Sequence, residues 1–170
     1  MLTGLVQTPW VRVPLVIVLA LALQTGVVAD LRIFGMAPDI MLLLAIASGL
    51  AVGPERGAIM GAVIGFSFDL VLQTPLGLSA LVYGLAALAV GMVSTGTIKS
   101  TRWIPVVATM AASAAAVALY ALLAAVFGLE RAFGLRLAPM ILVVAGVNGL
   151  LALPALAVMR WARAADDRRV

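Results

Sequence analysis

Long apolar stretches separated by short polar breaks organise this chain. Six such stretches cover residues 13–29, 40–53, 57–73, 77–96, 104–128 and 138–160. A hydrocarbon core of about 30 Å requires about 20 apolar residues in a helix, so most of these stretches predict transmembrane helices. The second is short and is joined to the third by the turn Pro54-Glu55-Arg56. We therefore expect six spans, with five spans plus a re-entrant hairpin as the alternative.

The composition assigns the whole chain to the membrane. It is 65% hydrophobic and 11% charged, with a mean hydropathy of +1.22, whereas soluble domains carry about 25% charged residues. Six spans within 170 residues leave no room for a separate soluble domain of about 100 residues. The expected fold class is an all-α polytopic membrane protein, a single helical bundle forming one integral membrane domain over residues 1–170.

The basic residues predict the orientation. With six spans, eight of the eleven lie on the side of the termini: Arg12, Arg56, Lys99, Arg102, Arg160, Arg163, Arg168 and Arg169. Three lie on the other side: Arg32, Arg131 and Arg136. The positive-inside rule then puts both termini in the cytoplasm, and Trp10, Trp103 and Trp161 fall at that interface. Topology explains the basic residues better than nucleic-acid binding does. Since no clear small-residue cleavage site follows the first stretch, we expect a retained span there and not a signal peptide.

Small residues recur at helical spacing in the third and fourth stretches. The third has Gly57, Gly61 and Gly65, and the fourth has Gly77, Ala80, Gly84, Ala87 and Gly91. Such rows let helix backbones approach closely, so we expect them at helix-helix contacts. An alanine-rich chain also produces such rows by chance, and we accept that explanation for the alanines of residues 111–116.

Two acids, Asp39 and Asp69, are the candidate contacts for a partner or ligand. The topology puts both on the extracytoplasmic side, with Asp69 about 6 Å inside Gln73 at 1.5 Å per residue. An acid within a span is by default a functional-site hypothesis. For Asp39, which follows Pro38, the alternative is a helix start where a negative charge meets the positive end of the dipole. For Asp69 the alternative is a structural acid bonded to a neighbouring helix. Its partners could then be Arg32, Arg131 or Arg136.

The residues needed for most catalytic chemistry are missing from the sequence. There is no Cys and no His, which removes thiol chemistry, the commonest general base and the commonest metal ligand. An aspartyl dyad needs two carboxylates in one site, and only Asp69 lies well inside a span. We therefore expect no enzyme, no metal and no cofactor. We expect Gln24 and Asn148 to form interhelical hydrogen bonds.

The order of motifs between residues 38 and 91 resembles the rod shape-determining protein MreD family. Pro38-Asp39 opens an apolar helix, Gly53 and a charged turn follow, and a glycine-rich helix ends in Phe68-Asp69. The pattern closes with Pro75-Leu76-Gly77-Leu78-Ser79-Ala80-Leu81. The motifs consist of common membrane residues, so their order and spacing carry the resemblance.

The resemblance implies a non-enzymatic inner-membrane subunit of the bacterial cell-elongation machinery. It implies a bitopic MreC-like partner and indirect association with MreB-like filaments and with a synthase pair of a SEDS glycosyltransferase and a penicillin-binding protein. It also implies a fold like the substrate-binding subunits of energy-coupling-factor transporters. The alternative function is therefore a small-molecule binding or transport subunit, with Asp69 and the outer ends of the second to fourth spans forming a pocket.

Overall fold

The computed structural model describes residues 9–28, 35–72, 75–97, 103–128 and 137–164. These ranges contain seven α-helices and one π-helical segment, and no β-strand. The helices are α2 (Pro9–Leu23), α3 (Ile40–Val52), α4 (Pro54–Asp69), α5 (Leu78–Thr97), α6 (Trp103–Val126), α7 (Leu137–Leu150) and α8 (Ala152–Arg163), and the π-helical segment η1 (Gln24–Val28) continues α2. The prediction of an all-helical chain is confirmed for these residues.

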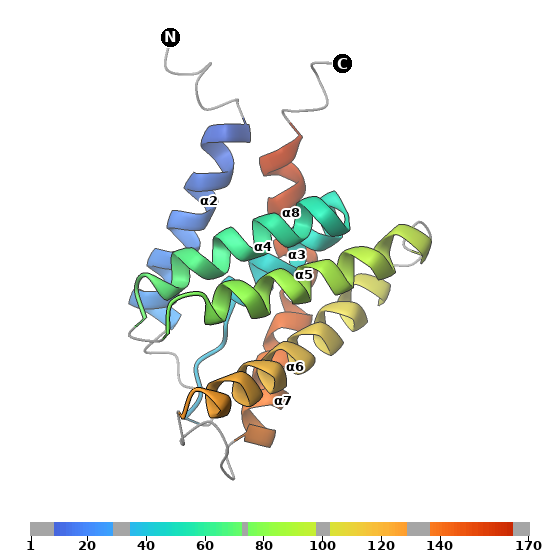
Figure 1. Cartoon of the computed structure of the whole chain (residues 1–170). Helices are drawn as coiled ribbons and strands as arrows, with labels where there is room; N and C mark the ends of the chain where they lie inside the picture. The colour runs from blue at the N-terminus through green and yellow to red at the C-terminus, as the bar shows by residue number, and fades with distance from the viewer. Residues whose placement is uncertain (1–8, 29–34, 73–74, 98–102, 129–136, 165–170) are drawn as a thin grey trace.

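Helix α3 is the centre of the molecule. All ten residues from Met41 to Leu50 are buried, so this helix is apolar and covered on every side. It contacts α2, α4, α5, α6 and α8, and in Figure 1 the helices α4 and α5 lie in front of it. A helix of 13 residues is about 20 Å long at 1.5 Å per residue, shorter than the hydrocarbon core.

A tight turn joins α3 to α4. Gly53 has φ +86°, a conformation that favours glycine, and its N–H donates to the Gly49 carbonyl at 3.1 Å. Pro54 then occupies the first turn of α4, where a missing N–H costs nothing. Helix α4 consequently begins at Pro54 and ends at Asp69, three and four residues earlier than the expected limits 57 and 73.

Small residues bring α3, α4 and α5 into backbone contact. A Cβ atom at Gly61 would lie 2.7 Å from the Tyr83 carbonyl oxygen, and one at Gly57 would lie 2.5 Å from the Gly49 Cα. Gly65 faces Ser79 and Ala80, Gly84 faces Ala58 and Ala62, and Gly91 faces Pro54. The Cβ of Ala87 occupies the space next to Gly61. These positions are therefore points where a larger side chain would push two helices apart.

The last predicted stretch forms two helices. Helices α7 and α8 meet at Leu151 with a bend of 57°. Pro154 lies in the first turn of α8, and its ring excludes a hydrogen bond to the carbonyl of Leu150, which bends the chain at this point. The expected continuous helix over residues 138–160 is thus broken, and its two halves pack on different parts of the bundle (Figure 1).

The surface of the helices is apolar, as in a membrane protein, but only some of the helices are long enough to cross a membrane. Among the described residues, α6 alone is long and apolar enough to cross a membrane by itself, and α7 with α8 passes the same test as one bent pair. The apolar segments Val11–Val27, Ile40–Val52 and Leu78–Ser94 are shorter. Large apolar side chains are exposed over the surface, including Leu142 (74%) and Leu150 (81%), as expected for lipid-facing positions.

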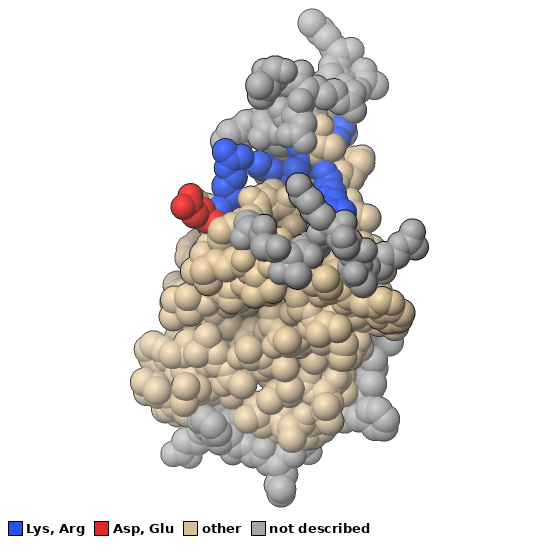
Figure 2. Space-filling model, turned by 90° about the vertical axis from the view of Figure 1, so that its right-hand side faces the viewer, with Lys and Arg blue, Asp and Glu red and all other residues tan. Residues whose placement is uncertain are grey.

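The described arginines gather at one end of the molecule. They are Arg12, Arg56, Arg160 and Arg163, and Figure 2 shows the basic side chains in one band above a broad uncharged surface. The Arg12 guanidinium donates to the Trp161 carbonyl at 3.2 Å and lies 4.7 Å from the centroid of the Trp161 ring. The start of α2 and the end of α8 therefore lie side by side (Figure 1).

Candidate functional site

Asp39 lies where α3 begins and joins that helix to α5. Its Oδ1 accepts a hydrogen bond from the Leu42 N–H at 2.8 Å, the bond of a helix N-cap. Its Oδ2 accepts from the Tyr83 hydroxyl at 2.5 Å. The Met41 N–H also interacts with this carboxylate. Since a carboxylate offers about four lone-pair sites, Asp39 can still accept from one further donor. Asp39 therefore starts helix α3, as one of the two interpretations of the sequence expected, and it also stays a candidate contact for a partner or ligand.

Gln24 connects the end of α2 to the same helix start. Its side-chain amide donates to the Pro38 carbonyl at 2.9 Å, and its carbonyl accepts from the Ile40 N–H at 2.8 Å. Both bonds satisfy backbone groups that have no partner within α3. Gln24 therefore fixes the segment that carries Asp39. Asn148, the other buried amide, donates to the Ser113 hydroxyl at 3.0 Å and joins α7 to α6.

Asp69 binds the start of α5 from the end of α4. Its Oδ2 accepts from the N–H groups of Gly77 at 2.9 Å and Ala80 at 3.2 Å, and its Oδ1 accepts from that of Ser79 at 3.2 Å. The side chain is 1% exposed. It thus caps a helix that starts nine residues further along the chain. Three alternative partners suggested by the sequence, Arg32, Arg131 and Arg136, lie outside the described residues.

Gly77 has a different setting from the other glycines of the predicted rows. It precedes α5, has φ +96°, and a Cβ there would meet no atom within 4 Å. A positive φ strains any residue with a side chain. Gly77 therefore shapes the turn whose N–H groups reach Asp69, and it lies outside the contact between helices.

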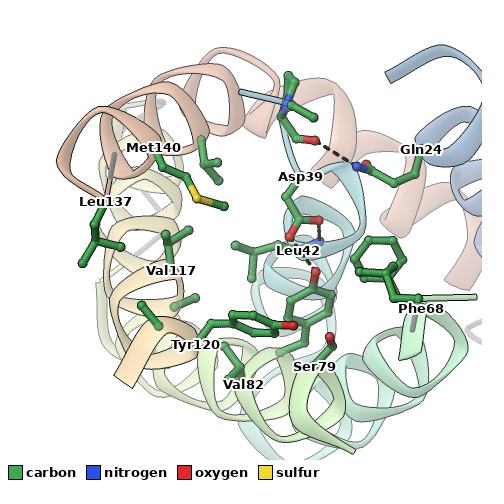
Figure 3. A pocket seen from close by; sticks show the side chains of 17 residues that line it. Gln24, Asp39, Leu42, Phe68, Ser79, Val82, Val117, Tyr120, Leu137 and Met140 are labelled. Atoms are coloured by element: carbon green, nitrogen blue, oxygen red, sulfur yellow. Dashed lines mark hydrogen bonds between the residues drawn. The ribbon is translucent and has the colours of Figure 1, made fainter. Parts of the chain in front are cut away.

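A cavity of about 710 Å³ lies beside Asp39. Its lining includes Gln24 and Phe68, which lie at the ends of α2 and α4 opposite to Arg12 and Arg56, so it is far from the described arginines. It is lined by Gln24, Ala37, Pro38, Asp39, Leu42, Phe68, Leu72, Ser79, Val82, Tyr83, Ala116, Val117, Tyr120, Ala121, Leu137, Met140 and Val144. In Figure 3, Gln24 and Phe68 lie on one side of it and Leu137 and Met140 on the other. The volume lies within the range of about 300 to 1,000 Å³ that is usual for binding pockets.

Aromatic residues of this cavity were missed by sequence reasoning. The chain has two tyrosines, and both of them, Tyr83 and Tyr120, line the cavity. Phe68 stacks on Tyr83 with ring centroids 6.3 Å apart. Their positions in the sequence could have indicated this. Tyrosines of membrane proteins concentrate at the interfaces, whereas these two lie well inside apolar stretches. Ser79 adds a buried hydroxyl that makes no hydrogen bond to any described residue.

The helices, the apolar surface and the mainly apolar cavity at one end are those of an all-helical membrane protein. The family model of the rod shape-determining protein MreD matches residues 6–161. The chain therefore belongs to the MreD family of rod shape-determining membrane proteins. Neither the curated proteins nor the solved structures contain a significant match to it. The likeness to substrate-binding subunits of energy-coupling-factor transporters consequently stays a prediction.

Proposed function

We propose that the protein is a non-enzymatic subunit of the cell-elongation complex in the inner membrane, and that its cavity binds a segment of an MreC-like bitopic protein. Its links to MreB-like filaments and to the SEDS and penicillin-binding-protein synthase pair are then indirect, through that partner. Membership of a shape-determining family supports the cellular role. The cavity beside Asp39 is the observation that carries the binding proposal.

The orientation of the cavity supports this proposal. The four described arginines gather at one end (Figure 2), and the cavity residues Gln24 and Phe68 lie at the other ends of α2 and α4. The positive-inside rule assigns the arginine end to the cytoplasm. The cavity then opens at the extracytoplasmic face, and the bundle crosses the membrane several times with both termini inside. Since α3 and α4 are about 20 and 24 Å long at 1.5 Å per residue, this topology requires local thinning of the bilayer around them.

The lining of the cavity indicates what it binds. Met140, Leu137 and Val117 supply an apolar wall, which suits the side chains of a hydrophobic helix. Asp39 supplies an acceptor site on the facing wall, which suits a cationic or N–H donor of the partner. Asp69, whose carboxylate is already bound to three N–H groups, acts by positioning α5 and does not touch the partner.

Copurification with the MreC-like partner tests the proposal. Met140 lines the cavity and is 42% exposed, so Met140→Trp should fill the cavity without disturbing the core. The control is Leu142→Trp on the same helix, since Leu142 lies outside the cavity and is 74% exposed. We expect Met140→Trp to abolish partner recovery and rod shape, and Leu142→Trp to retain both. Equal partner recovery with the two variants would disprove binding in the cavity.

A charge deletion separates recognition from folding. Asp39→Asn keeps an oxygen for the Leu42 N–H, because asparagine is as good an N-cap as aspartate. The Tyr83 hydroxyl can rotate to accept from the new NH₂ group. Because both bonds lose the charge of the acceptor, the free energy of unfolding should fall by about 2 kcal/mol. Partner recovery, measured on the folded fraction, should fall about tenfold if a further charge-assisted bond of about 1.5 kcal/mol is lost. Normal recovery of the partner by Asp39→Asn would exclude a charged contact at this position.

The alternative function is a small-molecule binding or transport subunit. The unbonded Ser79 hydroxyl in the cavity wall favours it, because a polar ligand would supply the missing partner. A binding subunit should retain a water-soluble ligand through purification, detectable by mass spectrometry of the denatured sample. Retention of such a ligand together with failure to recover the MreC-like protein would replace the assembly role.

A further inference from the structure

A second hollow lies on the outer surface between α2, α4 and α8. It has a volume of about 660 Å³ and is apolar over most of its length, with Val13 and Ile17 of α2 on one side and Ile59 and Val63 of α4 on the other. Its lining extends along α4 from residue 56 to residue 67, which is roughly 16 Å at 1.5 Å per residue. It shares no lining residue with the cavity beside Asp39.

The charges of this groove are all at one end. Arg56, in the first turn of α4, and Arg163, the last residue of α8, line the groove at the end of the molecule where the described arginines gather. No described carboxylate lines it. At the other end the Ser67 hydroxyl donates to the Val63 carbonyl at 2.8 Å, so its hydrogen-bonding need is met locally. The groove therefore has a cationic head and an apolar body.

We propose that this groove binds one anionic phospholipid of the cytoplasmic leaflet. The headgroup phosphate would lie between Arg56 and Arg163, and an acyl chain would lie along Ile59 and Val63. Arginine binds phosphate oxygens through paired N–H groups. An apolar strip continuing from such a pair matches an amphiphile, whereas a free anion would use the arginines alone. Exposed side chains in the strip, such as Ile59 (66%) and Val63 (51%), are accessible from the bilayer.

Location in the membrane supports a lipid as the occupant. The positive-inside rule puts the arginine end at the cytoplasmic interface, where anionic headgroups attract basic side chains. The groove begins at this level and runs toward the middle of the bundle, the direction that an acyl chain takes. A lipid in this position would contact α2, α4 and α8 together and would stabilise their packing.

Native mass spectrometry of the purified full-length protein tests the proposal, with phosphatidylglycerol and phosphatidylcholine of identical acyl chains as probes. We expect phosphatidylglycerol to bind more tightly. Each arginine near an anionic headgroup is worth about a fivefold preference. Arg56→Gln should therefore lower the preference about fivefold, and the double variant with Arg163→Gln roughly thirtyfold. Arg160→Gln is the matched control, because Arg160 is an exposed arginine at the same end that does not line the groove.

A second pair of variants tests the apolar body without changing charge. Val63→Phe should fill the groove and lower the occupancy of both lipids. Val93→Phe should change neither, since Val93 has a similar exposure (55% against 51%) on a different helix. If Arg160→Gln lowered the preference for phosphatidylglycerol as much as Arg56→Gln does, the preference would come from the general positive charge of this end and the proposal would be wrong. Competition with inorganic phosphate provides a second check. If phosphate displaces phosphatidylglycerol equally well from the wild type and from Val63→Phe, the site binds a free anion and the lipid proposal is wrong.

Discussion

The buried carboxylate of Asp69 provides the sharpest test of how this fold is held together. In Asp69→Asn the side chain keeps its size but has one acceptor atom instead of two. If the amide oxygen takes the place of Oδ2, it still accepts from Gly77 and Ala80, and the NH₂ group then faces the Ser79 N–H. Two donors would point at each other in a site that is 1% exposed.

The cost follows from these contacts. A buried donor left without an acceptor costs about 1–3 kcal/mol, and each remaining bond weakens by about 1 kcal/mol when the acceptor loses its charge. With one donor unsatisfied and two bonds weakened, the free energy of unfolding of Asp69→Asn should fall by about 3–5 kcal/mol. Unfolding by a denaturing detergent in mixed micelles, followed by circular dichroism, measures this change.

Glu55→Gln is the matched control, because it removes an exposed carboxylate from the other end of the same helix. We expect that variant to lie within about 0.5 kcal/mol of the wild type. A change of less than about 0.5 kcal/mol for Asp69→Asn as well would refute the assignment of Asp69 as the cap of α5. Normal stability with lost partner recovery would instead show that Asp69 contacts the partner directly.

Three further outcomes follow from the packing and the topology. Gly49→Ala should lower the free energy of unfolding by 2 kcal/mol or more, about the cost of overpacking, because its Cβ would overlap the Ala87 carbonyl. Gly146→Ala, an exposed helix site with no atom within 4 Å, should be neutral or stabilising by up to about 1 kcal/mol. Gln24→Leu leaves two backbone groups at the start of α3 unbonded and should cost about 2 kcal/mol in the same unfolding assay. A reporter fused after Val170 should be active in the cytoplasm, and periplasmic activity would reverse the proposed orientation.

Helix positions were largely predictable from the sequence, because apolar run length and helix-ending residues are local signals. The runs at 40–53, 77–96 and 104–128 correspond to α3, α5 and α6 within two residues at each end. The break between α7 and α8 was not anticipated. Pro154 alone did not predict it, since prolines inside membrane helices are often accommodated by neighbouring groups and its effect depends on tertiary packing.

The candidate site was only half accessible to sequence reasoning. Asp39 and Asp69 were recognisable because a charge in an apolar run is expensive wherever it points. Their partners were not recognisable. The three N–H groups that bind Asp69 belong to the backbone of residues 77–80. Because every residue except proline has such a group, the sequence does not show which ones bind the acid. The cavity likewise joins segments far apart in the chain, and only their arrangement in space brings Tyr83 and Tyr120 to one wall.

Helix α5 connects the two acids. Asp69 fixes the first turn of α5 through Ala80 and its neighbours, and Tyr83, one turn later, donates its hydroxyl to Asp39. Because Gly61 lets the backbone of α5 approach α4 closely at Tyr83, the position of that hydroxyl depends on both the cap and the packing. Movement at the Asp69 cap would therefore shift the Tyr83 bond and the wall of the cavity. The buried Asp69 carboxylate therefore sets the geometry of the hydrogen bond between Tyr83 and Asp39.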